Sequence, residues 1–373
     1  MIFSPVETPR FGRRLKDPLP VFDECLGHGF SWETDGGRVC PLSLRTEQVK
    51  TILLFSVGSN SFCLKNRRNR ASQKLARISA MIINGKKVGQ LGNRLFLFAH
   101  LIAAAEEYGV PLVNPAFAEY AKLFPATSRD LWCRYPAVRG GQMPTHSVAR
   151  NAVSKAVELG GRGLNCLGGR LRNLEVIRLR SGQELDLGGK QFADLVAAKH
   201  VLLQGWLFRS ERLLQKHASQ VRQHFDISSG IKREIHTKIA ELRERTEVVV
   251  GIHIRHGDYA SYLNGKYFYS LQQYATVMKR ITEQLSPKRV GFLVCGNSSF
   301  DHEDFKGLHV LCGAGGVIED LYAFAEVDLL IGPPSTFTGW ASFYGNVPLH
   351  WLESVNNLAD VRGLIRDGKC RVA

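Results

Sequence analysis

Apolar runs alternate with amphipathic stretches through the last third of the chain, which is its most regularly patterned part. Apolar runs predict strands, and apolar residues at helical spacing predict helices. The predicted strands are Val248–Ile254, Val290–Cys295, Leu308–Cys312, Asp328–Ile331 and Val347–Leu352, and the predicted helices are Tyr269–Leu285, Val317–Glu326 and Ser335–Tyr344. Strands without a polar face that alternate with helices indicate a parallel sheet covered on both sides.

The preceding part of the chain is patterned less regularly. Good helix formers from Leu95 to Tyr108, followed by Gly109, predict a helix with a glycine cap. Apolar runs predict strands at Pro111–Val113 and Val201–Trp206, and a charged amphipathic helix is predicted over Ile231–Arg245. Residues 120–200 are mixed, and we expect turns at the glycine pairs Gly160-Gly161, Gly168-Gly169 and Gly188-Gly189.

Residues 1–80 differ from the rest of the chain. Their only apolar run is Thr51–Val57, and Lys65–Arg70 is a basic run that favours solvated chain. Either Met81, where regular patterning begins, is the true start of the protein, or residues 1–80 are a basic tail that contacts a membrane or a partner. We expect a poorly ordered extension over 1–80, an N-terminal domain over 81–246 and a C-terminal domain over 247–373.

The net charge of the chain limits the classes of molecule that it is expected to bind. Forty-nine Lys and Arg residues against 34 Asp and Glu residues give a formal net charge of +15, which attracts nucleic acid, anionic membranes or phosphate-bearing substrates. No nucleic-acid-binding motif is visible, so we expect no nucleic acid partner. The absence of a long apolar run or a secretory signal, together with eight scattered cysteines, predicts a cytoplasmic protein, with peripheral contact to an anionic membrane left open.

Three segments carry candidate chemistry, and the first is the loop Gly89–Arg94, which follows a basic strand end and opens a helix. Glycines allow close approach of the backbone to a ligand, and helix N-terminal amides bind phosphate. The spacing matches neither the dinucleotide fingerprint nor the Walker pattern. An ordinary tight turn before a helix explains the loop equally well.

The second segment is Gly251–Tyr259, where an apolar strand ends in a cluster of polar side chains. Strand periodicity places His253 and Arg255 on one face. The planar guanidinium of Arg255 suits the oxygens of a diphosphate. A structural ion pair between Arg255 and Asp258 is the alternative.

The third segment is Ile331–Thr338, in which two prolines follow a predicted strand and precede a predicted helix. Ser335 falls at the N-cap position, and the hydroxyls and free amides there form a second candidate anion site. The alternative is a capped helix without a ligand.

Together the three segments resemble the α-1,2-fucosyltransferases and their relatives, the core α-1,6- and protein O-fucosyltransferases. Those families carry a Gly-x-x-Gly-Asn-Gln loop, a His-x-Arg-Arg-Gly-Asp-Tyr strand end, and a Ser-Ser/Thr-Phe helix start after an Ala-Asp-hydrophobic strand. The resemblance covers roughly residues 82–352, and its most specific part is His253–Tyr259. Two positions depart from it: Arg94 stands for the loop Gln, and His256 for the second Arg.

The resemblance implies an α/β protein of GT-B type, with two Rossmann-like domains facing a cleft, that transfers L-fucose from GDP-fucose to a glycan with inversion. It implies a galactoside α-1,2-type enzyme. It also implies roles for seven residues, and Asp258 is added from its position as a candidate catalytic base that could equally just orient Arg255. Arg255 would hold the β-phosphate, His253 and Asp320 would contact guanine, Ser335 and Thr336 would bind phosphate oxygens, and Gly92 and Asn93 would approach the diphosphate and fucose; Asp258 is the nearest candidate base.

The sequence contains no Asp-x-Asp pair, which metal-dependent glycosyltransferases use to hold a divalent cation. We therefore expect no metal cofactor, with Arg255 stabilising the leaving diphosphate in its place. A non-catalytic nucleotide- or glycan-binding protein of the same fold is the alternative, and His256 is its main support. The acceptor is not identified by any motif.

Overall fold

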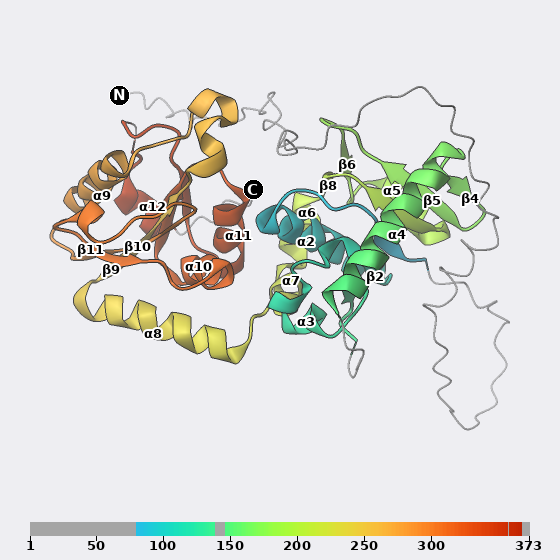
Figure 1. Ribbon diagram of the computed structural model, residues 1–373, viewed down its shortest axis with the longest axis horizontal. Coiled ribbons are helices and arrows are strands. Elements are labelled where there is room, and N and C mark those ends of the chain that lie inside the picture. The colour runs from blue at the N-terminus through green and yellow to red at the C-terminus, as the bar shows by residue number, and fades with distance from the viewer. Residues whose placement is uncertain (1–79, 139–145, 357, 368–373) are drawn as a thin grey trace, which may run out of the picture.

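The computed structural model describes residues 80–138, 146–356 and 358–367. Within these residues the strands form a six-stranded sheet, a five-stranded sheet and a two-stranded sheet, with helices packed around them (Figure 1). The predicted α/β class is confirmed. Thr51–Val57 and Lys65–Arg70 lie outside the described residues, so the expectations for 1–80 remain predictions.

The five-stranded sheet is parallel throughout and has the order β11-β10-β9-β12-β13. Its strands are β9 (Val248–Ile254), β10 (Val290–Gly296), β11 (His309–Cys312), β12 (Leu329–Gly332) and β13 (Leu349–Trp351). The chain moves outward from β9 in one direction through β10 and then in the other through β12. The carboxyl ends of β9 and β12 therefore flank the switch point, where ligands bind in sheets of this kind.

Both faces of this sheet are buried, as its apolar strands predict. Val248, Val250 and Ile252 share a cluster with α9 (Leu271–Leu285), whereas Val249 belongs to the cluster on the opposite face. The other helices around this sheet are α8 (Ser229–Arg245), α10 (Val317–Ala323), α11 (Thr336–Gly345) and α12 (Val361–Asp367).

The six-stranded sheet has the order β3-β2-β1-β7-β5-β4, with β2, β1, β7 and β5 parallel and an antiparallel strand at each edge. Its strands are β1 (Ile82–Asn84), β2 (Leu112–Val113), β3 (Arg134–Tyr135), β4 (Arg170–Leu171), β5 (Leu174–Arg178) and β7 (His200–Gln204); β6 (Glu184–Asp186) and β8 (Leu207–Arg209) form the small sheet. The helices of this part are α2 (Leu91–Tyr108), α3 (Pro125–Ser128), α4 (Ser147–Cys166), α5 (Lys190–Ala198), α6 (Glu211–Lys216) and α7 (Ala218–His224).

Helix α2 joins the two larger sheets. It is buried along most of its length, and Phe96 packs edge-on against Trp340 of α11 with ring centroids 5.6 Å apart. Phe225, which follows α7, also packs against Trp340, at 5.1 Å. One hydrophobic cluster therefore crosses from the first part of the chain to the second, and the domain boundary at residue 246 remains a prediction.

The expected turn at Gly160-Gly161 is wrong, because both glycines lie inside α4. A Cβ on Gly161 would lie 2.4 Å from Gln204 Nε2 and 2.7 Å from Leu202 Cδ2. Glycine is needed there because α4 lies directly on strand β7, and the pattern alone does not separate this use of glycine from a turn.

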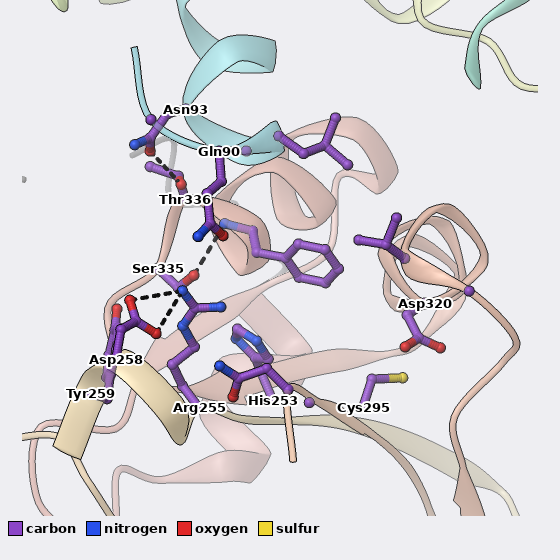
Figure 2. A pocket seen from close by; sticks show the side chains of 18 of the residues that line it. Gln90, Asn93, His253, Arg255, Asp258, Tyr259, Cys295, Asp320, Ser335 and Thr336 are labelled. Carbon is purple, nitrogen blue, oxygen red and sulfur yellow. Dashed lines mark hydrogen bonds and ion pairs between the residues drawn. The ribbon is translucent and has the colours of Figure 1, made fainter. Parts of the chain in front are cut away.

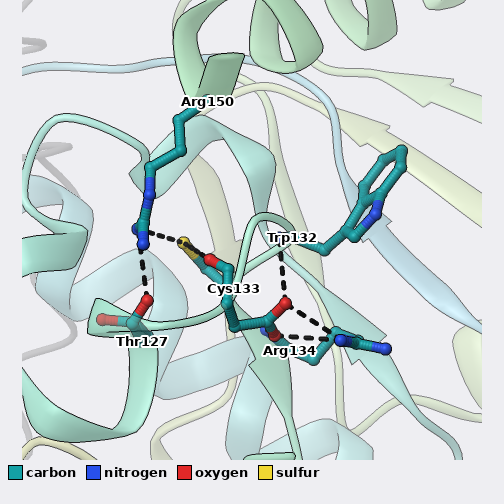
Figure 3. Close-up of polar contacts among 6 residues, drawn as sticks. Thr127, Trp132, Cys133, Arg134 and Arg150 are labelled. Atoms are coloured by element: carbon teal, nitrogen blue, oxygen red, sulfur yellow. Dashed lines mark hydrogen bonds and ion pairs between the residues drawn. The ribbon is translucent and has the colours of Figure 1, made fainter. Parts of the chain in front are cut away.

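A buried arginine fixes the start of α4 to the segment between α3 and β3 (Figure 3). Arg150 Nη1 donates to the Thr127 carbonyl at 3.1 Å, and Nη2 donates to the Ser128 carbonyl at 2.6 Å. These carbonyls end α3, where a helix has free acceptors and a partial negative charge. Arg150 therefore compensates its buried charge with helix-end carbonyls.

No helix within the described residues is both long and apolar enough to cross a membrane.

Candidate active site

A cavity of about 530 Å³ lies at the carboxyl ends of β9 and β12, next to the N-terminus of α2 (Figure 2). Every residue singled out from the sequence as a site residue lines it: Gly92, Asn93, His253, Arg255, Asp258, Asp320, Ser335 and Thr336. These residues span almost 250 positions of the chain, and the fold brings them together. Their individual roles remain predictions.

Arg255 and Asp258 form an ion pair on the wall of the cavity. Arg255 Nη2 lies 3.0 Å from Asp258 Oδ1 and 3.1 Å from Oδ2, and both side chains are partly exposed. The guanidinium also lies over the Tyr259 ring, 5.2 Å from its centroid. The predicted structural pair thus forms, but in a cavity wall, and the buried Arg255 Nε has no partner among the described residues. Arg255 is held in one orientation with part of its donor set unused.

His253 lies buried beneath the cavity. Its ring stacks on Phe337 with centroids 5.3 Å apart and an interplanar angle of 29°. Burial and the nearby Arg255 charge lower the pKa of His253 to about 3, so the ring is neutral at physiological pH. Its buried Nδ1 has no hydrogen-bond partner within the described residues, and such an atom is costly without one.

Asp320, on α10, faces the cavity from the opposite side (Figure 2). Its Oδ1 accepts the Ala314 backbone N–H at 2.7 Å, which fixes the carboxylate. Burial raises the pKa of Asp320 from its ordinary value and raises the pKa of the adjacent Cys295 thiol well above its usual range. The thiol therefore stays protonated, and Asp320 offers hydrogen-bond acceptors in a half-buried setting.

The first turns of α2 and α11 meet at the cavity. A Cβ on Gly92 would lie 2.8 Å from both the backbone carbon and the Oγ1 of Thr336 and 2.9 Å from the Phe337 nitrogen. Thr336 Oγ1 donates to Asn93 Oδ1 at 2.7 Å. Glycine at position 92 thus permits close contact between the two helices, and the Asn93 amide orients across the junction.

Ser335 is the N-cap of α11, as its position predicts, and its Oγ accepts the Phe337 N–H at 3.2 Å. The hydroxyl hydrogen remains a donor. The first backbone N–H groups of α11 and α2 have no acceptor within their own helices. Together with Arg255, these two helix ends make this side of the cavity electropositive.

The two departures from the family pattern lie outside the cavity lining. Arg94 Nε donates to the Gly89 carbonyl at 3.0 Å, and its Nη1 pairs with Glu119 at 2.7 Å. Arg94 therefore stabilises the loop without lining the cavity. His256 Nε2 lies 2.7 Å from the Tyr269 carbonyl oxygen, and its ring packs on Phe268 with centroids 4.7 Å apart.

Some lining residues were not predicted from the sequence. They include Tyr120, Cys295, Asn297, Gly315 and Gly316, whereas Gln90 and Phe337 belong to the predicted loop and helix start but were given no role. Asn297 follows β10 and accepts the His256 N–H at 2.7 Å, which ties two strand ends together. Its place after a central parallel strand was a signal for it, whereas Tyr120 reaches the cavity from a segment without a pattern. No group of three or more His, Cys, Asp or Glu side chains suited to a metal occurs among the described residues.

Comparison with known proteins agrees with this fold. No family model and no curated protein matches the chain. A mutant of FUT1 from Arabidopsis thaliana, solved in complex with GDP, matches with a TM-score of 0.50 at 12% identity over 82% of this chain and 74% of that chain. Lower similarity is found to fucosyltransferase NodZ from Bradyrhizobium (TM-score 0.42, 17% identity, 73% of this chain, 96% of that chain) and to POFUT1 in complex with GDP-fucose (0.39, 12%, 73% and 95%). The chain therefore shares its overall fold with FUT1.

Proposed function

We propose that the protein is a glycosyltransferase that moves L-fucose from GDP-fucose to a glycan acceptor, with inversion at the anomeric carbon. The observation that carries the proposal is the convergence of Arg255, Asp320 and two helix N-termini on one cavity of about 530 Å³. The similarity to FUT1, whose structure contains GDP, supports the proposal at the level of the fold. An α-1,2 linkage to galactosides rests on the sequence resemblance alone.

The cavity suggests how the donor binds. We propose that the diphosphate lies between Arg255 and the first turn of α11, with Ser335 as a hydroxyl donor. Because the Thr336 hydroxyl already donates to Asn93, Thr336 contributes its backbone amide. The Asn93 amide nitrogen has no protein acceptor among the described residues and is available to the donor sugar.

The guanine ring of the donor would lie at the other end of the cavity, between His253 and Asp320. The Asp320 carboxylate accepts N–H groups of guanine, and the neutral His253 ring offers its unpaired Nδ1. GDP is therefore expected to bind in preference to UDP, which lacks the guanine donors.

The reaction needs charge stabilisation above all. An acceptor hydroxyl oxygen bonds to fucose C1 while the bond from C1 to the β-phosphate oxygen breaks, and its electron pair leaves with GDP. The hydroxyl proton passes to the Asp258 carboxylate. Arg255 and the helix amides stabilise the growing negative charge, and we propose that transfer therefore requires no added divalent metal.

We also propose the GT-B arrangement, with residues 81–246 on the acceptor side and 247–373 on the donor side. The five-stranded parallel sheet supports it, as does a cavity lined by residues of both parts. The alternative is a non-catalytic binding protein of the same fold, because His256, which stands for the second Arg of the family pattern, lies outside the cavity lining and leaves Arg255 as the only arginine among the described lining residues.

The test is GDP-fucose turnover by the full chain against a panel of galactosides and other glycans, with and without EDTA. We expect GDP release together with an acceptor product that carries one added deoxyhexose, at a rate unchanged by EDTA. GDP binding without turnover on any acceptor would favour the non-catalytic alternative. Loss of activity in EDTA that manganese restores would contradict the metal-independent mechanism.

A further inference from the structure

A second cavity, of about 270 Å³, lies beside the first one. It is lined by three segments at the carboxyl ends of the parallel strands β1, β5 and β7 of the six-stranded sheet: Lys86 and Val88, 178–183, and 205–207. Because β7 pairs in parallel with both β1 and β5, these segments meet at one edge of the sheet. The second cavity thus occupies the same kind of position as the first.

Hydrogen bonds hold the segments that form the wall of this cavity. The Leu179 N–H donates to the Gln204 carbonyl at 2.9 Å, which joins the segments after β5 and β7. The turn that carries Arg180 is closed from both sides, since Arg180 N–H donates to Gln183 Oε1 at 2.8 Å and Gln183 N–H to the Arg180 carbonyl at 3.1 Å. Gly182 supplies the positive φ of 75° that this turn needs.

The charged side chains described as lining this cavity are all positive. Lys86, Arg178 and Arg180 line it, and no Asp or Glu is among its described lining residues. None of the three cations has an ion-pair or side-chain hydrogen-bond partner among the described residues. The neighbouring Lys87, in contrast, pairs with Glu119 at 3.0 Å. Three cations that have no partner within the described part of the chain favour an anionic ligand in this cavity.

An aromatic surface accompanies the charge. The half-buried Trp206 lines the cavity, and the Arg209 guanidinium lies over its ring at 4.0 Å from the centroid, which holds the indole in place. An indole with an apolar face and an N–H donor suits a ligand that is partly apolar and partly hydroxylated, such as a sugar ring.

One residue connects the two cavities. Asn93 lines both of them. A molecule in the second cavity would therefore lie next to the sugar end of a donor in the first. This adjacency matches what transfer needs, which is an acceptor hydroxyl held close to the donor carbon.

We propose that the second cavity binds the acceptor and that the acceptor is a saccharide bearing an anionic group, either a carboxylate or a phosphate. The identification as acceptor rests on the proposed function. Arg178, Arg180 and Lys86 bind the anion, and Trp206 packs against the sugar. The attacking hydroxyl is a neutral group of the same saccharide, so the bonds made and broken are those of fucosyl transfer.

The test compares matched probes on the full chain with GDP present. A galacturonate trimer is compared with its methyl ester, and galactose 6-phosphate with galactose. Calorimetry measures binding, and where turnover occurs KM is measured too. We expect at least tenfold tighter binding of an anionic probe than of its neutral partner, about one charge-assisted contact. The anion that shows the larger gain in affinity over its own neutral partner identifies the carboxylate or the phosphate as the natural group.

The double variant Arg178→Gln/Arg180→Gln is expected to lose this preference, with a tenfold or greater fall in affinity for the anionic probe and unchanged affinity for GDP. The matched control is Arg170→Gln/Arg172→Gln, which removes the same charge from edge strand β4 and the turn after it, outside both cavities, together with the exposed ion pair of Arg170 with Glu175. Equal binding of charged and neutral probes, or an equal loss in both double variants, would overturn the proposal. Failure of GDP to bind would count against the proposed function alone, since the saccharide titrations are read independently.

Discussion

At the residue scale, Arg255 has the largest expected effect on the chemistry. We predict that Arg255→Ala lowers the turnover number about 10²–10³-fold, because it removes a fixed donor to the leaving diphosphate. Arg255→Lys should rescue little, since an ammonium lacks the planar fork. Circular dichroism and melting curves should be unchanged, because the side chain lies at a cavity wall. Wild-type turnover in either variant would remove Arg255 from the mechanism.

Buried histidines predict a loss of stability in mild acid. Burial lowers the pKa of His224 to about 4 and that of His253 to about 3, against an ordinary value near 6.5. Below pH 6.5 these two histidines bind protons in the unfolded chain but stay neutral in the folded protein. The free energy of unfolding should therefore fall by about 1.4 kcal/mol per pH unit for each histidine, down to the folded-state pKa.

Urea unfolding at pH 7 and pH 5 measures this loss. His224 packs among Phe98, Tyr135 and Phe225, so His224→Phe keeps an aromatic ring and removes one titrating group. The variant should lose less stability between the two pH values than the unaltered protein. An identical pH dependence in both proteins would refute the assignment.

Site residues were predictable where chemistry follows a strongly patterned strand. Arg255 and Ser335 stand out because charged and capping residues directly follow apolar runs. Asn297 directly follows the apolar run of β10, which is a signal of the same kind although it was missed, whereas Tyr120 did not stand out, since a lone phenol in an irregular segment is common on any surface. Thr336 was expected to bind phosphate oxygens, and that role stays a prediction; the contact of its hydroxyl with Asn93 had no signal in the sequence, because it joins helices far apart along the chain.

At the element scale, the junction of α2 and α11 is a sensitive point. We predict that Gly92→Ala destabilises the protein by about 1–3 kcal/mol, because the new methyl would meet the Thr336 backbone at 2.8 Å and separate the two helices. GDP affinity should fall as well, since both helix N-termini face the cavity. Thermal unfolding and GDP titration measure the two effects.

Gly163→Ala is the matched control for this substitution. Gly163 lies in α4, where an added Cβ would meet nothing within 4 Å. Alanine should raise or leave unchanged the stability, because it favours a helix by up to about 1 kcal/mol over glycine. If Gly92→Ala were as harmless as this control, the close contact of α2 and α11 would not matter.

The strands of the C-terminal sheet were predicted closely, because the apolar runs of its central strands β9, β10 and β12 are buried on both faces. The region of residues 120–200 resisted prediction for two physical reasons. It contains very short strands, such as β4 with two residues, and α4 carries Gly161 where it touches β7. Helix α2 begins at Leu91 rather than Leu95, because the Gly92-Asn93 pair reads as loop although it forms the first turn.

At the scale of the whole molecule, the described sheets begin with strand β1, which starts at Ile82, directly after Met81. We predict that a shortened chain beginning at Met81 folds and binds GDP like the full chain. Strand β1 lies between β2 and β7, so its integrity is essential. Melting curves of both chains, with and without GDP, provide the comparison. A short chain that aggregates or does not respond to GDP would place residues 1–80 within the fold.

The central claim is that the first cavity holds a guanosine diphosphate sugar through Arg255. Isothermal titration of the full chain with GDP and with UDP, repeated on Arg255→Ala, tests this claim most directly. The account predicts one site per chain, a clear preference for GDP, and affinity at least tenfold weaker in the variant. Equal heats for GDP and UDP, or GDP affinity that is unchanged by Arg255→Ala, would contradict it.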